Sequence, residues 1–225
     1  NATLQRLPAR KVIADAARRF AIGDRVDVDE LADFFNRTGF ERVGTVREAG
    51  EYAVRGGILD IFPPGNDMPI RIDLFGDEIE ALRVFDAATQ RSSEKIEEFS
   101  LKPASEVFLD EDSIARFRTG YREAFGNITE DPLYSAVSEG RKQIGMEHWL
   151  PLFHETLDTL FDYLPGASVT LDNDADQVQD GRLETISDYY DARITYLRNR
   201  KVNDVSGQPP YKPLPADSLY LDARE

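Results

Sequence analysis

Three acidic side chains at alternate positions are the first residues whose spacing could support chemistry. Asp172, Asp174 and Asp176 follow an apolar stretch, and alternating carboxylates are typical of a calcium-binding loop. Gln177 stands where such a loop needs glycine, and Leu183 stands where it needs a bidentate glutamate. We therefore interpret this segment as an acidic strand-to-helix loop in water. The alternative is a residual nucleotide- or metal-dependent hydrolase built on Asp172.

Other catalytic patterns are weak or missing. His148 and His154 lie six positions apart around Pro151, which is not a compact zinc spacing, and we expect them at the margin of a core. A Ser/His/Asp triad is compatible with the composition, but no nucleophile-elbow sequence occurs. Neither phosphate-binding glycine motif occurs, and Gly56-Gly57 is interpreted as a pair inside a strand, marking a bulge or a close backbone approach. We therefore predict no catalytic residue, no cofactor and no metal site.

A binding surface is the stronger candidate, and it lies in residues 51–85. This stretch predicts three or four short strands separated by turns, because apolar and polar residues alternate between turn-forming clusters. Within 70–75, the aliphatic residues lie on one face and Arg71, Asp73 and Phe75 on the other. An aromatic ring beside an arginine suits a protein interface, since an exposed phenylalanine gains little from folding.

Arg55 on the neighbouring strand extends this surface. We expect it to share a face with Ala53, Gly57 and Leu59, where the glycine leaves room for a partner. The alternative is structural: Arg71 and Asp73 form a cross-strand salt network, and Phe75 covers a minor hydrophobic cluster.

Two helices are predicted ahead of these strands. The first covers residues 11–21 with Phe20 directed inward. The second begins at Asp27, which forms an aspartate version of the capping box with Glu30, and it ends at Gly39.

The predicted sheet begins at 40–46 and gains one more strand at 91–101. Pro103 closes the unit. We therefore expect an α+β interaction domain at 11–103, with helices against an antiparallel sheet, after a linker from an upstream subdomain at 1–10.

Residues 104–225 have a different character, with longer helical patterns and proline-broken apolar pieces. The expected elements are helices at 111–125 and 131–139, a short buried strand at 167–171, an amphipathic helix at 181–200, a loop at 203–215 and a last strand at 218–221.

Composition restricts the class of partner. The net charge of −15 argues against nucleic-acid binding by the chain as a whole, although duplex binding through the arginine-rich strands is an alternative. The charge is compatible with a basic or mixed protein partner. No apolar run approaches the ~18 residues of a membrane span, and no signal-like stretch follows Asn1, so we expect a fragment of a longer cytoplasmic protein.

Several longer motifs occur in a consistent order. They are RLPAR (6–10), EYAVRGGILDIFPPG (51–65), PIRIDLFGDEIEALRVFD (69–86), TQRS (89–92), GMEHWLPLF (145–153) and TLFDYLPGASVTLDND (159–174). In these motifs the chain resembles the N-terminal part of bacterial transcription-repair coupling factors (Mfd), which is itself similar to the excinuclease B subunit (UvrB).

The resemblance implies a fold and the loss of an activity. It implies an antiparallel-sheet interaction domain with flanking helices, followed at 104–225 by a partial, degenerate RecA-like α/β subdomain of the helicase type. Asp172-Asn173 takes the place of the acidic Walker B pair, and an amide cannot accept a proton from water. The resemblance therefore implies that this fragment is not an enzyme, and that the ATP-driven motor of the parent lies outside this chain.

The resemblance also implies a partner, the excinuclease A subunit (UvrA). The family's docking residues, two arginines and a phenylalanine, fall on Arg55 in VRGG, Arg71 in PIRID and Phe75 in DLFGD. For the parent protein it implies translocation on duplex DNA, displacement of RNA polymerase stalled at a lesion, and recruitment of excision repair. This fragment would supply the recruitment step.

Overall fold

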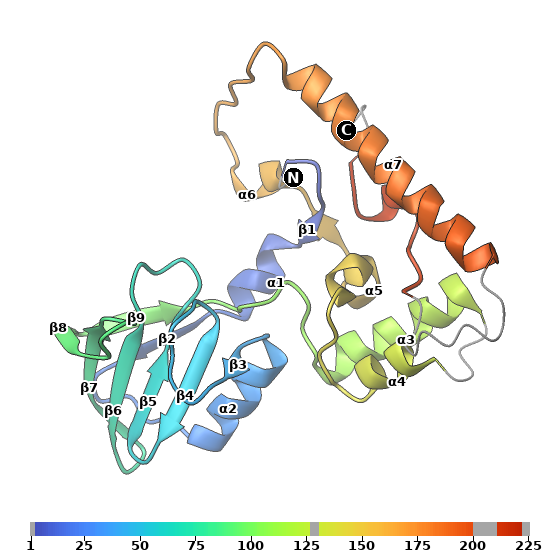
Figure 1. The fold of residues 1–225 in the computed structure, drawn as a ribbon. Helices are drawn as coiled ribbons and strands as arrows, with labels where there is room; N and C mark the ends of the chain where they lie inside the picture. Colours follow the sequence, from blue (N-terminus) through green and yellow to red (C-terminus); the bar gives the residue numbers. More distant parts are fainter. Residues whose placement is uncertain (1–2, 127–130, 200–210, 222–225) are drawn as a thin grey trace. The chain divides into compact units, whose positions relative to one another are not determined.

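The computed structural model describes residues 3–126, 131–199 and 211–221. The chain has a mixed α+β fold and divides into two compact units (Figure 1). Residues 11–109 form the first, here the sheet unit. Residues 1–10 and 110–225 form the second, here the helical unit.

A six-stranded sheet in the order β3-β4-β5-β6-β7-β8 dominates the sheet unit. Its neighbours pair antiparallel except for β3 and β4, which are parallel. The strands are β3 (Glu41–Arg42), β4 (Glu51–Arg55), β5 (Ile58–Ile61), β6 (Ile70–Phe75), β7 (Glu78–Phe85) and β8 (Ser92–Ile96). The predicted meander at 51–85 is confirmed, whereas only two residues of the predicted 40–46 segment form a strand.

One face of this sheet packs against helix α2 (Val28–Arg37), whose predicted bounds are confirmed. Among the contacts described, only the Asp27 half of the predicted capping box is formed, because the Glu30 carboxylate accepts a hydrogen bond from Arg18 Nη2 at 3.3 Å. The Asp27 carboxylate accepts hydrogen bonds from the backbone N–H groups of Asp29 and Glu30 at 2.9 and 3.1 Å, which caps the helix N-terminus. Past its end, Gly39 has φ +88°, and an added Cβ would lie 2.3 Å from the Ser105 Cβ. Only glycine therefore fits at this position.

The core between the helix and the sheet is aliphatic and aromatic. Its buried members from α2 and the large sheet include Leu31, Phe34, Phe35, Tyr52, Leu59, Ile61, Ile70, Ile72, Ile79 and Leu82. They alternate along the strands with residues of the opposite face, which fixes the register because a one-residue slip would expose them all.

The prediction of a helix over 11–21 is wrong after its first turns. Helix α1 covers Arg10–Asp15, and β2 (Arg18–Ala21) then pairs antiparallel with β9 (Glu98–Leu101). The ring of Phe20 stacks on that of Phe99 with centroids 5.3 Å apart. The predicted single strand at 91–101 is accordingly two strands, β8 and β9, in different sheets. In both segments, 18–21 and 91–101, pairing with distant strands determines the structure. The local periodicity of the sequence carries no information about such pairing.

Gly56-Gly57 forms the two-residue turn between β4 and β5, so the prediction that it lies inside a strand is wrong. Gly56 has φ +59°, which suits the turn. The predicted close approach of backbone is present, because a Cβ on Gly57 would lie 2.9 Å from the carbonyl oxygen of Leu74.

The helical unit is assembled around aromatic side chains. Its elements are β1 (Leu7–Pro8), α3 (Glu111–Phe125), α4 (Pro132–Ser138), η1 (Met146–Trp149), α5 (Leu150–Phe153), β10 (Leu157–Asp158), α6 (Leu160–Tyr163), α7 (Ala175–Asn199) and η2 (Ala216–Ser218). The Phe117 ring stacks on Phe153 at 4.9 Å, and the Tyr121 ring meets Trp149 edge-on at 5.2 Å. Residues 7–8 join this unit by pairing with β10.

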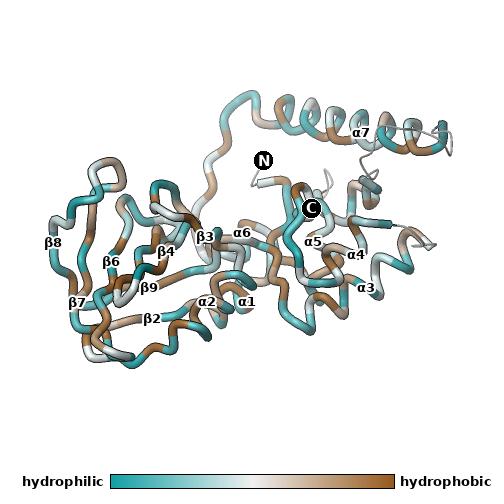
Figure 2. The backbone as a smooth tube through the Cα atoms, turned by 60° about the horizontal axis from the view of Figure 1, so that its bottom comes forward, coloured by the Kyte–Doolittle hydropathy of each residue, from teal (hydrophilic) through white to brown (hydrophobic). Residues whose placement is uncertain are grey.

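The predicted helices at 111–125 and 131–139 are present as α3 and α4. Helix α7 begins six residues earlier than predicted, and hydrophobic residues recur along it (Figure 2). Among the described residues, no helix combines the length and apolar character needed to cross a membrane.

Two predicted strands of this unit are wrong. Residues 167–171 form no strand and are exposed, with Val169 at 59% and Leu171 at 70%, because no described strand pairs with them. The predicted strand at 218–221 is the end of η2 and a single bridge between Gln5 and Tyr220. Of the predicted loop at 203–215, residues 203–210 lie outside the described residues.

Candidate protein-docking site

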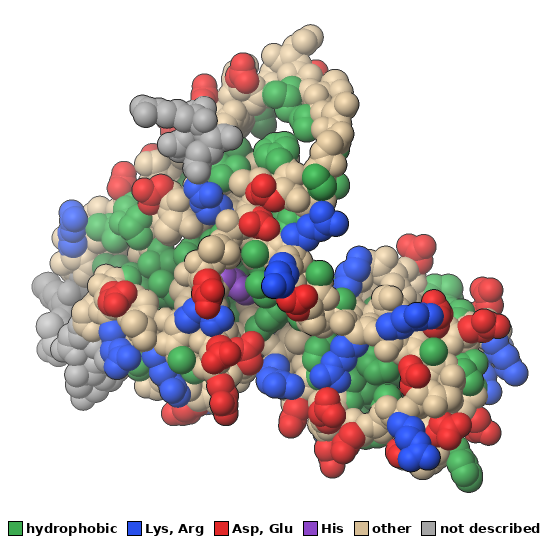
Figure 3. All heavy atoms as spheres, turned by 180° about the vertical axis from the view of Figure 1, so that it is seen from behind, with side chains coloured by type: hydrophobic (Ala, Val, Ile, Leu, Met, Phe, Trp, Pro, Cys, Tyr) green, Lys and Arg blue, Asp and Glu red, His purple; other side chains and the backbone are tan. Residues whose placement is uncertain are grey.

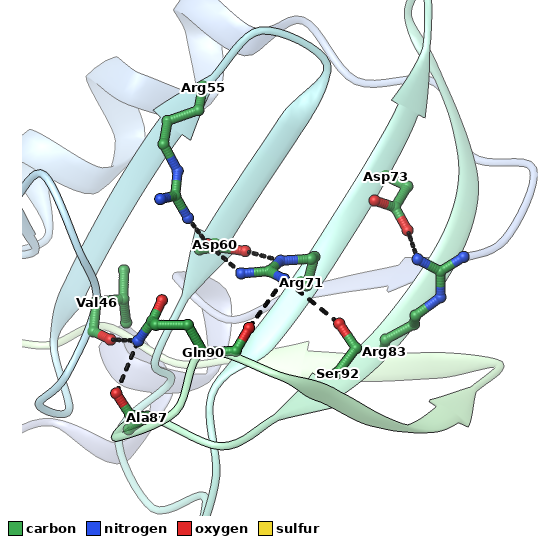
Figure 4. Close-up of polar contacts among 9 residues, drawn as sticks. All are labelled: Val46, Arg55, Asp60, Arg71, Asp73, Arg83, Ala87, Gln90 and Ser92. Atoms are coloured by element: carbon green, nitrogen blue, oxygen red, sulfur yellow. Dashed lines mark hydrogen bonds and ion pairs between the residues drawn. The ribbon is translucent and has the colours of Figure 1, made fainter.

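The sheet face opposite α2, here the open face, carries a set of charged side chains (Figure 4). Strand pairing places Asp60, Arg71 and Arg83 side by side across the sheet. Asp60 lies opposite Arg71 on β5 and β6, and Arg71 lies opposite Arg83 on β6 and β7. A directly opposed pair of arginines is unfavourable unless nearby carboxylates neutralise them.

Asp60 supplies one of those carboxylates and is completely buried, with 0% of its side chain exposed. Its two oxygens accept hydrogen bonds from Arg71, at 2.7 Å from Nε and 2.9 Å from Nη2. Arg55 donates from Nη2 to the same carboxylate. A buried carboxylate is tolerated here because both of its oxygens are paired with cationic donors.

Arg71 is fixed by further hydrogen bonds and by a ring contact. Its Nη1 group donates to the carbonyl oxygen of Gln90 at 3.3 Å and to the Ser92 hydroxyl at 3.4 Å. Its guanidinium carbon lies 4.7 Å from the ring centroid of Phe85. The hydrogen bond to Asp60 raises the pKa of Arg71, so the group stays charged. Only 16% of its side chain is exposed.

A second carboxylate neutralises the neighbouring arginine. Asp73 lies 2.7 Å from the Nη1 of Arg83. The predicted alternative of a network between Arg71 and Asp73 is therefore wrong in its partners, since Arg71 pairs with Asp60 and Asp73 with Arg83.

Phe75 ends β6 and is 80% exposed, so it does not cover a hydrophobic cluster as the structural alternative supposes. Leu74 before it packs on the core, which places Phe75 on the open face by alternation. Along the strand, four residues separate it from Arg71, or about 13 Å. The three predicted residues thus share one face, within the width of an ordinary protein interface.

Two details of the sequence prediction need correction. Leu59 points into the core and not to the face of Arg55, whose partner across β4 and β5 is Ile58. Asp60, on which both arginines converge, was missed. A single charged residue inside the apolar segment ILDIF was its signal, because a carboxylate in such a strand needs a cationic partner.

The other predicted centres are not organised for chemistry. Asp172, Asp174 and Asp176 are exposed, and among the contacts described the Asp172 carboxylate accepts a hydrogen bond only from the neighbouring backbone N–H of Asn173. Over residues 3–126, 131–199 and 211–221, no group of three or more His, Asp or Glu side chains could hold a metal ion. His148 is exposed with its ring 5.6 Å from that of Tyr211, whereas His154 is buried.

Comparison with known proteins places the open face in a recognised domain. Residues 19–107 match the UvrB interaction domain family. The chain is 40% identical over 206 residues to the transcription-repair-coupling factor of Haemophilus influenzae, which covers 90% of this chain and 17% of the relative.

The transcription-repair-coupling factor of Escherichia coli gives 36% identity over 230 residues, covering 100% of this chain and 19% of the relative. That of Rickettsia prowazekii gives 34% over 221 residues, 98% of this chain and 19% of the relative. The chain thus spans less than a fifth of the length of these relatives. It belongs to the transcription-repair-coupling factor family, as the N-terminal region that contains the UvrB interaction domain.

Proposed function

We propose that this chain is a non-catalytic docking region that recruits the excinuclease A subunit (UvrA) through Arg55, Arg71 and Phe75 on the open face. In the longer protein, recruitment would bring excision repair to RNA polymerase stalled at DNA damage. Polymerase displacement and ATP-driven movement on duplex DNA would belong to other parts of that protein.

The observation that carries this proposal is the exposure of Phe75. A phenylalanine at 80% exposure on a paired strand contributes almost nothing to its own unit. On the same face, the Arg55 side chain is 47% exposed. Aromatic anchors next to arginine are the residues that dominate binding energy at interfaces, because a partner can desolvate both together.

Charge distribution favours a protein over duplex DNA as the partner. On the side of the sheet unit seen in Figure 3, acidic and basic side chains are interspersed and form no single-sign patch. Three arginines on the open face, Arg55, Arg71 and Arg83, are already paired with Asp60 or Asp73. Phosphate binding requires clustered unpaired cations, and the net charge of −15 opposes it further.

We propose that the domain division follows function: a linker at 1–10 that is attached to the helical unit by the pairing of β1 with β10, the interaction domain at 11–103, and a degenerate, partial RecA-like α/β subdomain at 104–225. The Asp172-Asn173 pair supports loss of hydrolysis in the last of these, because one carboxylate of the acidic pair is replaced by an amide. No observation favours the alternative hydrolase.

Calorimetric titration of the 225-residue chain with purified excinuclease A tests the proposal. We expect Phe75→Ala and Arg55→Ala each to weaken binding by about 30-fold or more, in line with about 2 kcal/mol for an interface anchor. Matched controls are Tyr189→Ala, an exposed aromatic residue of the helical unit, and Arg25→Ala, an exposed arginine of the sheet unit.

The controls should bind as the unsubstituted chain does. Equal affinity of the unsubstituted chain and an Arg55→Ala/Arg71→Ala/Phe75→Ala variant would refute the site. Thermal melting of each variant shows whether a loss of binding reflects a loss of fold.

A further inference from the structure

The two arginines that converge on Asp60 differ in what they can still offer a partner. A guanidinium has five N–H donors. Arg71 makes four hydrogen bonds, to Asp60, Gln90 and Ser92, and its flat face covers Phe85. Its donors are therefore nearly used up inside its own unit, and only 16% of its side chain is exposed.

Arg55 is in the opposite situation. Among the described residues its side chain has one partner, Asp60, reached from Nη2. About half of the side chain, 47%, is open to solvent, and most of its donors remain free. Figure 4 shows its side chain extending from β4 with the guanidinium turned toward Asp60 and Arg71. An exposed arginine without such an anchor would sample many rotamers and would lose that freedom on binding.

We propose that Asp60 is a positioning residue of the docking face: held in place by Arg71, it orients Arg55, and Arg55 alone of the two arginines contacts the partner. This inference rests on the proposed docking function and refines it. Arg71 acts through Asp60 and not by touching the partner.

The arrangement defines the chemistry of the complementary surface. Asp60 and Arg71 neutralise each other, so the group of three carries one positive charge, located on Arg55. Arg55 can present a planar pair of donors, which fits one carboxylate side chain. Phe75 lies two strands across and two residues along the sheet from Arg55, or about 12 Å away. The partner therefore needs an apolar pocket for Phe75 at about that distance from its carboxylate. The partner surface should therefore combine one acidic residue with one apolar pocket.

A double-mutant cycle on the 225-residue chain, measured by calorimetry with excinuclease A, tests the positioning role. We expect Arg55→Ala to weaken binding about 30-fold and Asp60→Asn about tenfold. The combined variant should stay near 30-fold, because an absent Arg55 cannot be misplaced.

The matched control cycle pairs Arg55→Ala with Asp73→Asn, since Asp73 holds Arg83 on the same face. There the separate effects should multiply. Multiplication in the Asp60 cycle as well would overturn the positioning role while leaving the docking function intact. Failure of the unsubstituted chain to bind would overturn both.

A second cycle covers the case in which Asp60→Asn does not fold. Arg71→Lys keeps the positive charge beside Asp60 and loses the two-pronged contact. Its effect on binding should be about threefold or more in the unsubstituted background and should vanish in the Arg55→Ala background. An undiminished effect there would show that Arg71 contacts the partner directly, and would refute the proposal.

Discussion

Among the residues that the structure describes, each unit buries one aspartate against a lysine or arginine, and the two sites serve different ends. In the helical unit, Asp131 is 8% exposed on the side chain and lies 2.7 Å from Lys212, which is 81 residues away in sequence. It also accepts a hydrogen bond from the Tyr121 hydroxyl at 2.9 Å and from two backbone N–H groups that begin α4. The most exposed partner of Asp131 is Lys212, at 24% of its side chain, which is about half the exposure of Arg55.

Asp60 in the sheet unit is more deeply buried but has a partner that reaches solvent. Arg71 closes one side of it, and the half-exposed Arg55 closes the other. A buried carboxylate whose partners are mostly buried contributes to stability. One that shares an exposed cation can also set the geometry of a surface. The comparison therefore assigns a role in stability to Asp131 and a role in positioning a surface residue to Asp60.

The largest expected effect is on Asp131. Asp131→Asn should lower the free energy of unfolding of the helical unit by about 3 kcal/mol or more, because it leaves Lys212 without its counter-ion and weakens the cap of α4. Urea unfolding followed by tyrosine and tryptophan fluorescence measures it. Asp188→Asn, an exposed position on α7, is the control and should cause no comparable loss.

The pH dependence should follow from the same carboxylate. Burial by itself raises the pKa of Asp131, but hydrogen bonds from Lys212, the Tyr134 N–H and Tyr121 outweigh it and hold the pKa below its ordinary value. A depressed pKa means that this stabilisation is present above the unfolded-state pKa of about 3.9 and is lost as the pH falls further. If the urea midpoint of unfolding did not change with pH below pH 4, the stabilising role of the Asp131–Lys212 pair would be contradicted.

The next effect distinguishes the two arginines of Asp60. Arg71→Ala should destabilise the sheet unit by about 3 kcal/mol, because the buried carboxylate loses its two-pronged partner. Arg55→Ala should cost less than about 1 kcal/mol, because the Arg55 side chain is 47% exposed and the buried Asp60 keeps its two hydrogen bonds from Arg71. Chemical denaturation of both variants is the measurement. Equal losses in the free energy of unfolding would mean that the two arginines are equivalent. That result would contradict the argument from the number of donors that each uses within its own unit.

The smallest effect on stability belongs to Phe75. Phe75→Ala should change the free energy of unfolding by no more than about 0.5 kcal/mol, since the ring is exposed. Phe85→Ala, at 0% exposure on the same sheet, provides the contrast and should cost about 3 kcal/mol or more. A destabilisation by Phe75→Ala close to that of Phe85→Ala would show that the ring packs within its own unit.

Local patterns in the sequence were sufficient for several elements. Helix α2 follows from the cap at Asp27 and the apolar stripe of Leu31, Phe34 and Phe35. The strands from β4 to β7 follow from alternation between turn-forming clusters. Arg71 and Phe75 were assigned to one face by the same alternation. In each case the signal lies within a few residues, where side-chain spacing directly reflects backbone geometry.

Contacts between distant residues were decided only by the tertiary structure. Residues 18–21 form a strand because 98–101 lie beside them, although their local pattern continues a helix. Residues 167–171 have the composition of a strand and form none, since a strand requires a neighbour for its backbone hydrogen bonds. The sequence by itself thus determined which side chains share a face of β6. Only the pairing of three strands brought Arg55 and Arg71 together on Asp60. The two arginines are 5 and 11 positions from this carboxylate in the sequence.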